Sequence, residues 1–496
     1  MKTHHVFRLV KQSGIYALGN IAIKVSGLLL APFLLDTPYL SLAEYGQLGV
    51  LLIFAQLSIQ LGGLGLGTGL LKYVGKEELT DSNNFSAFTA FIASIGTAIT
   101  LYVVFWACSE YLSSLLLGNA SKASVLGYFG MYVGFKIIGA IPMMLLRIQE
   151  RAGVYAATII VEMTVLFAAI YFFLVVQQRG IEGIILSYTI ASGLSASVVV
   201  IAVILRVKWK FDASLIKILL RYGAPLVFVG LAGIILNAGD RFILKAITSD
   251  EEVGMYEWAA RMSGVLNLFV VQSFQLAFTV IGLKALGNGD GAFHRRVFRH
   301  YVVWSGWAAL GISILSYELT LLLNGLGASE HYLRSTQLVF PLAIGILIYG
   351  LFVVINNILY ATSKTSLMSK NVILSALCNV GLNFVLIPQW GAGGAAIATV
   401  LSYSILLGLT WRSSQRELTI QYSWHNLIKV LVLVSFLYTL SQLVVYMEFS
   451  QMHSIRILIL LVYPVCIILL KIYRTEEIKL GLNYVTDFIK RGSIIG

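Results

Sequence analysis

Three ionisable residues lie at similar depth in hydrophobic segments and could act electrostatically there. Lys136 and Glu162 are each eleven residues from the arginines of the connection between their segments, and Lys24 lies near the middle of its own. At 1.5 Å per residue this is about 16 Å from the flanking charges. A charge so deep in a bilayer costs about 2.5–3.5 kcal/mol and needs a partner or water. The spacing predicts either a structural Lys136–Glu162 pair, or a functional site in which Glu162 binds a proton or cation while Lys24 and Lys136 provide a positive field.

A second group of charges lies toward the opposite end of the segments. Asp240 follows Arg221 by nineteen residues, about 28 Å along a helix. We therefore expect Asp240 and Arg241 near the outer boundary, where long side chains reach water. Since adjacent residues do not face each other on a helix, each should need a separate partner or solvent. Arg261 adds a cation on this flank. The candidate anion-binding residues are Lys24, Lys136, Arg241 and Arg261, and the candidates for ion coupling are Glu162 and Asp240.

Amides complete the polar set. We expect most to form hydrogen bonds between helices and some to line a hydrated cavity, namely Asn237, Gln272, Gln275, Asn379 and Asn383. The sequence has no GxxxxGK[ST] and no H-E-x-x-H, so neither a built-in ATPase nor a metal or cofactor site is expected. The glycine string 62–67 follows an apolar helix, which indicates close packing or a soft point and not a dinucleotide site.

The composition requires that these residues be placed in a membrane. The chain has 496 residues, 58% hydrophobic and 12% charged, whereas a soluble protein has about 25% charged residues. Its three cysteines have no CxxC spacing, so no disulfide framework is expected. The net charge of +12 is interpreted as loop charge that fixes orientation, not as nucleic-acid binding. This composition excludes an ordinary cytosolic enzyme.

Charges and turn residues divide the chain into fourteen predicted helices. Their ranges are 13–35, 45–71, 86–108, 122–146, 153–176, 182–205, 222–247, 256–284, 299–323, 333–361, 367–387, 392–411, 425–446 and 454–473. Most of the 35 Lys and Arg fall at the N-terminus, in the even-numbered loops and in the tail. The odd-numbered loops hold only Lys122, Arg179, Arg334 and Arg456. The positive-inside rule then places both termini in the cytoplasm.

Two spaced patterns recur and predict an internal duplication. S-x-x-E-x-G occurs at 41–46 and 249–254, and Q-x-G-x-x-G at 178–183 and 389–394. The first is a capping box that begins a helix, and the second provides a tight turn. The copies are 208 and 211 residues apart, which is six helices in each case. This predicts two six-helix bundles of the same orientation, with two helices added at the C-terminus; coincidental turn chemistry is the alternative.

The predicted organisation follows from these boundaries. It consists of an N-terminal bundle (1–205), an amphipathic cytoplasmic linker helix (206–221), a C-terminal bundle (222–411), two additional membrane helices (412–473) and an amphipathic tail (474–496). Amphipathic segments of this kind lie on an anionic leaflet more often than they bind a protein partner.

The chain resembles the bacterial oligosaccharide flippases of the multidrug/oligosaccharidyl-lipid/polysaccharide exporter superfamily. The resemblance covers essentially the whole chain and depends on the order of several short motifs: Ser13-Gly-Ile-Tyr16, Gly19-Asn20, Pro32-Phe33, Glu44-Tyr45-Gly46, Gly63-Leu-Gly65, Asn237-Ala-Gly-Asp240-Arg241 and Glu252-Val-Gly-Met-Tyr256. It implies an all-α, MATE-like membrane fold of 6+6+2 helices. Asp240 and Arg241 match the pattern of the family directly, whereas Lys24 stands in for an arginine that many relatives have near the end of the first helix.

The resemblance also implies an activity that is not enzymatic. Such proteins move undecaprenyl-diphosphate-linked repeat units from the cytoplasmic to the periplasmic leaflet of the bacterial inner membrane, for O-antigen or other surface polysaccharide. An ion gradient of H⁺ or Na⁺ drives alternating access. The expected partners are the lipid-linked glycan, the coupling ion, membrane lipids, and a polysaccharide polymerase with its chain-length regulator; nucleic acid is not among them.

Two other functions compete with this interpretation. A cation-coupled multidrug extruder of the same superfamily would need a cavity rich in carboxylates, whereas the candidates at membrane depth are richer in cations: Lys24, Lys136 and Arg241 against Glu162 and Asp240. A membrane polymerase or ligase would need a large outer loop, and the predicted outer loops are short.

Overall fold

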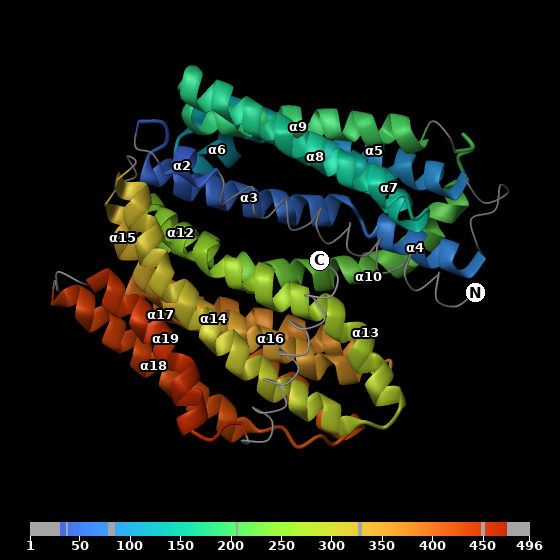
Figure 1. Ribbon diagram of the computed structural model, residues 1–496. Helices are drawn as coiled ribbons and strands as arrows, with labels where there is room; N and C mark the ends of the chain where they lie inside the picture. The colour runs from blue at the N-terminus through green and yellow to red at the C-terminus, as the bar shows by residue number, and fades with distance from the viewer. Residues whose placement is uncertain are drawn as a thin grey trace, which may run out of the picture. The chain divides into compact units, whose positions relative to one another are not determined.

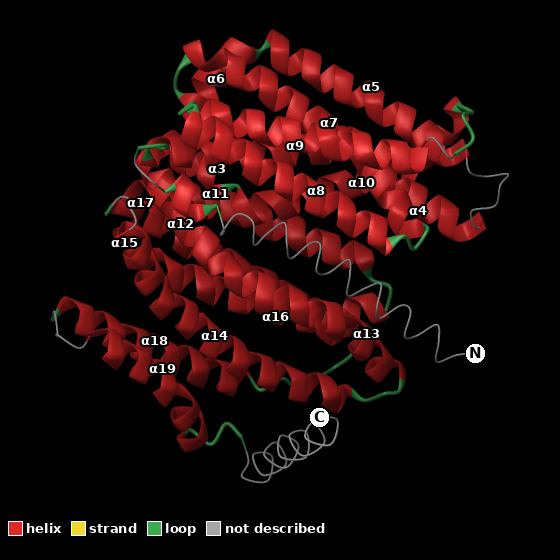
Figure 2. Ribbon diagram, turned by 45° about the horizontal axis from the view of Figure 1, so that its top comes forward, coloured by secondary structure: helices red, strands yellow, loops and turns green. Residues whose placement is uncertain are grey.

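The computed structural model is helical throughout the part of the chain that it describes, with loops and no strand there (Figure 2). The described residues are 30–35, 38–77, 85–204, 207–325, 330–447 and 452–473. Contacts divide the chain into two compact units. Unit 1 consists of Met1–Arg261, Thr320–Leu338 and Ser369–Ser402, and unit 2 of Met262–Leu319, Val339–Met368 and Tyr403–Gly496.

Unit 1 holds most of the helices that carry the candidate site. They are α2 (Ala31–Leu34), α3 (Leu42–Gly62), α4 (Leu66–Glu77), α5 (Phe85–Ala107), α6 (Ser109–Leu117), η1 (Ala120–Lys122), α7 (Ala123–Ile148), α8 (Ala152–Ile170), η2 (Tyr171–Val176), α9 (Gly180–Val203), α10 (Ala213–Ala238), α11 (Asp240–Ile247), α15 (His331–Ser335) and η5 (Thr336–Leu338). Helix α7 packs against both α5 and α9, which are labelled in Figure 1. Leu70, Leu145 and Val203 belong to one buried apolar cluster that joins α4, α7 and α9.

Unit 2 contains the C-terminal helices. They are η4 (Asn267–Gln272), α13 (Ser273–Gly287), α16 (Val339–Ala361), α18 (Trp424–Tyr446) and α19 (Met452–Leu469), while α12 (Asp250–Leu266), α14 (Gly291–Gly325) and α17 (Thr365–Glu417) contribute to both units. Helix α19 is joined to α14 by a buried charge. Arg456 is 0% exposed, and its Nη1 lies 2.6 Å from Oε1 of Glu318.

Twelve helical stretches of the described residues are long and apolar enough to cross a membrane by length and composition. One of them, α17, is divided at Gly391, whose φ of 52° and ψ of −132° are not helical. It therefore corresponds to the two predicted helices 367–387 and 392–411. The predicted all-helical membrane fold is confirmed. The predicted helix 13–35 lies almost wholly outside the described residues, as does the tail 474–496, so the count of fourteen stays a prediction.

Two predicted helices are broken. The predicted span 45–71 is interrupted after Gly62, where Leu64 and Gly65 have φ of 48° and 69°. A Cβ on Gly65 would lie 2.3 Å from the carbonyl of Gly223, so this break brings two backbones into direct contact. The interpretation of the glycine string as close packing is therefore confirmed. The predicted span 222–247 is divided at Gly239 into α10 and α11, although Gly239 keeps helical φ and ψ of −67° and −21°.

The predicted linker helix also differs from the structure. Helix α10 begins at Ala213, after Asp212 accepts a hydrogen bond from the backbone N–H of Ser214 at 2.9 Å. It then continues to Ala238 with Pro225 in its interior. The second half of the predicted linker is thus the first part of a helix long enough to span a membrane.

Candidate substrate and ion site

Four charged side chains join α11 to α12 within unit 1, and we name Asp240, Arg241, Glu257 and Arg261 the α11–α12 cluster. Nη1 of Arg241 lies 2.8 Å from Oδ1 of Asp240, and Nε of Arg241 lies 3.3 Å from Oε2 of Glu257. Nε of Arg261 lies 3.3 Å from Oε1 of the same Glu257. Glu257 therefore divides its two oxygens between two guanidinium groups. With all four groups ionised, the cluster has no net charge.

Asp240 is the most enclosed member of the cluster. It begins α11 and is 2% exposed. The hydroxyl of Tyr256 donates to its Oδ2, and the hydroxyl of Thr399 donates to the same oxygen at 3.3 Å. A buried carboxylate is costly unless hydrogen bonds compensate it. Here α12 and α17 supply them from residues far apart in the sequence.

Aromatic rings lie against both arginines of the cluster. The guanidinium carbon of Arg261 is 5.1 Å from the centre of the Tyr45 ring, and that of Arg241 is 5.0 Å from the Tyr256 ring. Contacts of this kind contribute about 0.5–2 kcal/mol, most where water is excluded. Because Tyr45 belongs to α3 and Thr399 to α17, the cluster joins these two helices to α11 and α12.

The structure differs from the sequence-based placement of Asp240 and Arg241 in two respects, although each residue does have a separate partner, Tyr256 for Asp240 and Glu257 for Arg241. They are 2% and 8% exposed, so they do not reach water at the end of a helix. They also bind each other, although they are adjacent in the chain. The physical reason is the length of the Arg241 side chain: Gly239 keeps helical backbone angles (φ −67°, ψ −21°), and the guanidinium group reaches back along the preceding turn. Nη1 of Arg241 also donates to the carbonyl of Asn237 at 3.2 Å.

The predicted contact between Lys136 and Glu162 is confirmed. Their side chains form an ion pair between α7 and α8, with 31% and 23% of each side chain exposed. The two charges therefore meet, as is expected for residues at the same depth on neighbouring antiparallel helices. Lys24 lies outside the described residues, so its position near this pair stays a prediction.

The amides on α17 are buried and do not line an open cavity in this structure. Asn379 and Asn383 are 1% and 0% exposed. Asn379 Nδ2 donates to Oγ of Ser402 at 3.2 Å, and Asn383 Nδ2 donates to Oδ1 of Asn379 at 3.0 Å. Because Asn379 precedes Gly391 and Ser402 follows it, the amides hold the two segments of α17 together.

The other predicted cavity amides are distributed over both units. Asn237 near the end of α10 donates from Nδ2 to the carbonyl of Gly233 at 2.6 Å, within its own helix. Gln272 at the end of η4 and Gln275 in α13 belong to unit 2, and both are half-buried. The predicted set is therefore not brought together within one unit.

The two copies of S-x-x-E-x-G meet at their glycines. A Cβ on Gly46 would lie 2.1 Å from the carbonyl oxygen of Asp250 and 2.7 Å from the backbone nitrogen of Gly254. A Cβ on Gly254 would lie 2.3 Å from the carbonyl oxygen of Leu42. Helices α3 and α12 therefore cross with their backbones in contact, which only glycine allows at both positions. Next to the crossing, Nε2 of Gln47 donates to Oδ2 of Asp250 at 2.7 Å.

The glutamates of these motifs reach the second repeated pattern. Oε2 of Glu252 accepts the backbone N–H of Ala392 at 2.8 Å, directly after Gly391. In the first copy, a Cβ on Gly180 would lie 3.2 Å from Oε1 of Glu44, so that carboxylate also lies against the glycine of Q-x-G-x-x-G. In each half, the acid of one motif thus contacts the turn of the other.

The first of these motifs also forms the capping box that the sequence predicts. Oγ of Ser41 accepts the backbone N–H of Glu44 at 3.2 Å, and the Glu44 carboxylate accepts the backbone N–H of Ser41 at 3.3 Å. Lys122 pairs with Oε1 of Glu44 at 3.2 Å. In the second copy, Oγ of Ser249 accepts the N–H of Glu252 at 3.3 Å.

Sequence reasoning missed three residues of the cluster environment. Glu257 stands four residues before Arg261, which is the spacing of a helical ion pair, so that signal was present. Tyr256 was noticed only as part of a family motif. Thr399 lies 159 residues from Asp240 and gave no signal.

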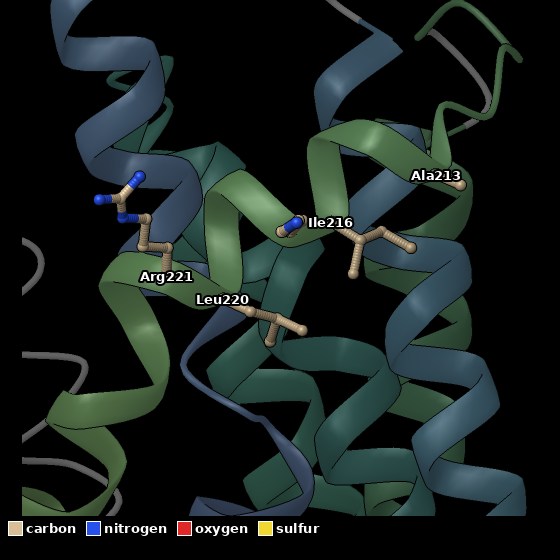
Figure 3. A pocket seen from close by; sticks show the side chains of 5 residues that line it. Ala213, Ile216, Leu220 and Arg221 are labelled. Carbon is tan, nitrogen blue, oxygen red and sulfur yellow. The ribbon is translucent and has the colours of Figure 1, made fainter.

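A surface hollow of about 660 Å³ lies at the beginning of α10. Its lining residues are Ala213, Ile216, Lys217, Leu220 and Arg221. Figure 3 shows these side chains along the first turns of one helix. The hollow has no acid and no link to the cluster, so it is not part of the candidate site.

Comparison with known proteins identifies two matching family models. The model described as a polysaccharide biosynthesis protein matches residues 9–279, and the model described as the lipid II flippase MurJ matches residues 292–465. Among curated proteins, the chain is 28% identical over 136 residues to a probable lipid II flippase MurJ of Thermotoga maritima, covering 26% of this chain and 28% of that protein. It is 26% identical over 211 residues to a probable low-salt glycan biosynthesis flippase, Agl15, of Haloferax volcanii, covering 41% and 44%. The matches thus span less than half of the length of either relative.

The chain also matches solved structures of the same fold over nearly the whole length of each. A lipid II flippase MurJ in an inward closed conformation has a TM-score of 0.75 at 14% identity, over 91% of this chain and 97% of that one. A multidrug resistance MATE family transporter of the MOP superfamily, in an inward-facing conformation, has a TM-score of 0.64 at 12% identity, over 83% and 97%. At these identities the likeness concerns the fold, and the predicted MATE-like architecture is confirmed.

Proposed function

Because the chain belongs to the polysaccharide biosynthesis protein family, whose model matches more than half of its length, we propose that it is a flippase for a lipid-linked oligosaccharide. The observation that carries the proposal is the agreement between the two parts of the chain. The N-terminal part matches the polysaccharide family, and the C-terminal part matches a family model named for a flippase. Both curated relatives are also named as flippases.

The proposed cargo is a repeat unit on undecaprenyl diphosphate. It moves from the cytoplasmic to the periplasmic leaflet of a bacterial inner membrane, for O-antigen or another surface polysaccharide. Both termini face the cytoplasm, and a gradient of H⁺ or Na⁺ drives the cycle. A polysaccharide polymerase and its chain-length regulator would act on the product.

Arginine and lysine bind the diphosphate in this proposal. Arg241 and Arg261 each present a planar set of N–H donors that matches phosphate oxygens, and enclosure strengthens this attraction compared with water. Lys136 and Lys24 extend the positive field toward the middle of the membrane. Glu162 and Asp240 are the proposed sites of ion coupling, and rocking of two six-helix bundles moves the cargo.

Transport by the purified full-length protein in vesicles tests the proposal. A fluorescent lipid-diphosphate oligosaccharide should cross to the opposite leaflet in vesicles with wild-type protein. Arg241→Gln or Arg261→Gln should lower the rate of crossing by about tenfold or more, since each loses a charge-assisted contact. Arg334→Gln, at an exposed position of α15, is the matched control and should transport normally. In cells, Lys24→Ala should abolish surface polysaccharide at unchanged protein abundance. Normal transport by both cluster variants would refute the assigned site.

The α11–α12 cluster has no net charge, and this also fits one competing function. Two acids and two bases are also compatible with a cationic drug, the cargo of a multidrug extruder of the same fold. Ethidium efflux separates the two functions. We expect none from the wild-type protein under conditions in which the lipid-linked sugar is moved, and robust efflux without lipid transport would replace the proposal.

A further inference from the structure

Glu257 occupies the place that an anionic cargo would need. Its two oxygens lie 3.3 Å from Nε of Arg241 and 3.3 Å from Nε of Arg261. The exposed fractions of the three side chains are 13% for Glu257, 10% for Arg241 and 17% for Arg261. The group is thus enclosed but retains a small open side. A diphosphate that approaches these guanidinium groups meets a carboxylate already bound to both.

The surroundings hold Glu257 in this bridging position. Tyr45 of α3 lies against Arg261, one of its two partners, with 5.1 Å between the guanidinium carbon and the ring centre, and Tyr188 of α9 interacts electrostatically with Glu257 over a longer range. A Cβ on Gly49 of α3 would lie 3.0 Å from Cγ of Glu257, so the α3 backbone passes directly beside the side chain. Asp240 has a different environment: two hydroxyl groups donate to it as well as Arg241. Asp240 therefore keeps two hydrogen-bond donors when Arg241 turns to a cargo, whereas both contacts of Glu257 described above are with the arginines.

We propose that Glu257 is a built-in counter-anion that occupies the diphosphate site in the absence of cargo and takes up a proton when the diphosphate replaces it. This inference rests on the proposed function and names the residue that links cargo binding to a proton. Sequence reasoning had assigned ion coupling to Glu162 and Asp240 alone.

Competition for the two arginines and the balance of charge in the site both favour a proton on Glu257. A carboxylate and a diphosphate both accept hydrogen bonds from guanidinium groups, so one donor set does not serve both fully. When the diphosphate displaces ionised Glu257, an unpaired carboxylate is left in an enclosed site, which is costly. One proton from the aqueous side, bound to Oε1 or Oε2, removes that charge. The cluster then carries one net positive charge, which favours the anionic cargo.

The sign of the pH dependence follows from reciprocity. If diphosphate binding favours protonation of Glu257, protonation must favour diphosphate binding by the same factor. Affinity therefore rises as the pH falls through the range in which Glu257 takes up its proton. With one proton per cargo, the increase reaches about tenfold per pH unit within that range.

Binding of farnesyl diphosphate to purified full-length protein tests this, with farnesol as the control ligand without phosphate. The dissociation constant is measured by titration calorimetry across the pH range in which the protein stays folded. Glu257→Gln keeps the shape of the side chain without its charge, so it should bind about tenfold more tightly than wild type at the upper pH and lose most of the pH dependence. Glu257→Asp, which retains the carboxylate, should keep the pH dependence. Glu110→Gln, an exposed acid of α6, is the matched control for loss of one negative charge and should behave like wild type.

The outcomes separate this inference from the function on which it rests. If Arg241→Gln and Arg261→Gln weaken farnesyl diphosphate binding but Glu257→Gln matches wild type in affinity and pH dependence, the counter-anion role is refuted while the anion site stands. If wild type binds farnesyl diphosphate no better than farnesol and the arginine variants change nothing, the anion site and the role of Glu257 both fail. Thermal unfolding of each variant, compared with wild type, verifies that a lost signal is not lost folding.

Discussion

Replacement of Gly46 by alanine would place a methyl group inside the crossing of α3 and α12. The new Cβ would lie 2.1 Å from the carbonyl oxygen of Asp250 and 2.7 Å from the nitrogen of Gly254. Both neighbours are backbone atoms, so no side chain can rotate away to make room. The helices must separate, or the Gln47–Asp250 hydrogen bond and the backbone around it must shift.

The size of the effect follows from these distances. Carbon and oxygen atoms approach to about 3.3 Å in weak hydrogen-bonded contacts, so the crossing must open by about 1 Å. Overpacking of this kind costs about 1–3 kcal/mol, equivalent to a factor of about 5–150 in an equilibrium between packed and separated helices. The methyl group should therefore depopulate every state in which these helices are in contact.

Hydrogen exchange of the purified protein measures this population directly, because opening exposes backbone amides. We expect faster exchange in residues 42–50 and 250–258 of Gly46→Ala, a lower Tm and a slower lipid transport rate. Gly264→Ala, in the same helix α12 but with nothing within 4 Å of its Cβ, is the matched control and should resemble wild type. Exchange and Tm in Gly46→Ala equal to those of Gly264→Ala would mean that the close approach is not needed.

Three further changes test the ion pairs and caps. Lys136→Ala and Glu162→Ala should each lower Tm, with the double variant less affected than the sum, because a coupling of about 0.5–3 kcal/mol is lost once; additive effects would contradict a direct pair. Arg456→Met should lower the free energy of unfolding by about 3 kcal/mol or more, since it leaves the carboxylate of Glu318 in α14 without its buried arginine partner. An unchanged unfolding midpoint would show that α19 is held by apolar packing alone. Glu252→Ala should cost about 1 kcal/mol through loss of the cap on the second segment of α17, while Glu251→Ala, at an exposed neighbouring position, should cost little; equal Tm values for the two would refute the cap.

Relative position along neighbouring helices is the property that the sequence predicts well. Counting residues from flanking charges places Lys136 and Glu162 at the same height, and the structure joins them. Hydropathy likewise predicts the helical stretches, because a span needs a nearly continuous apolar run. Residue counts and hydropathy both depend only on distance along a helix, which the rise per residue fixes.

Counting residues predicts less well which way a side chain points around a helix and where a helix is broken. The separation of Asp240 from Arg241 considered only the directions of their Cβ atoms, whereas the long Arg241 side chain reaches back to Asp240 and to the carbonyl of Asn237. Thr399 reaches Asp240 from α17 because of how the helices pack, and no spacing in the sequence encodes that contact. The same holds for Asn379 and Asn383, whose four-residue spacing is equally compatible with a cavity wall and with a bond between packed segments.

The repeated motifs carried more information than their capping chemistry suggests. A capping box by itself predicts the beginning of one helix, which is a local statement. Two copies that both end in glycine predict more, because a helix pair can bring its backbones together only where neither side has a Cβ. Gly46 and Gly254 satisfy this condition at one crossing, and Glu44 and Glu252 extend from it to the two turns of the other motif. The two copies therefore depend on each other in the structure: each glycine needs the other, and a change in one copy alters the environment of both.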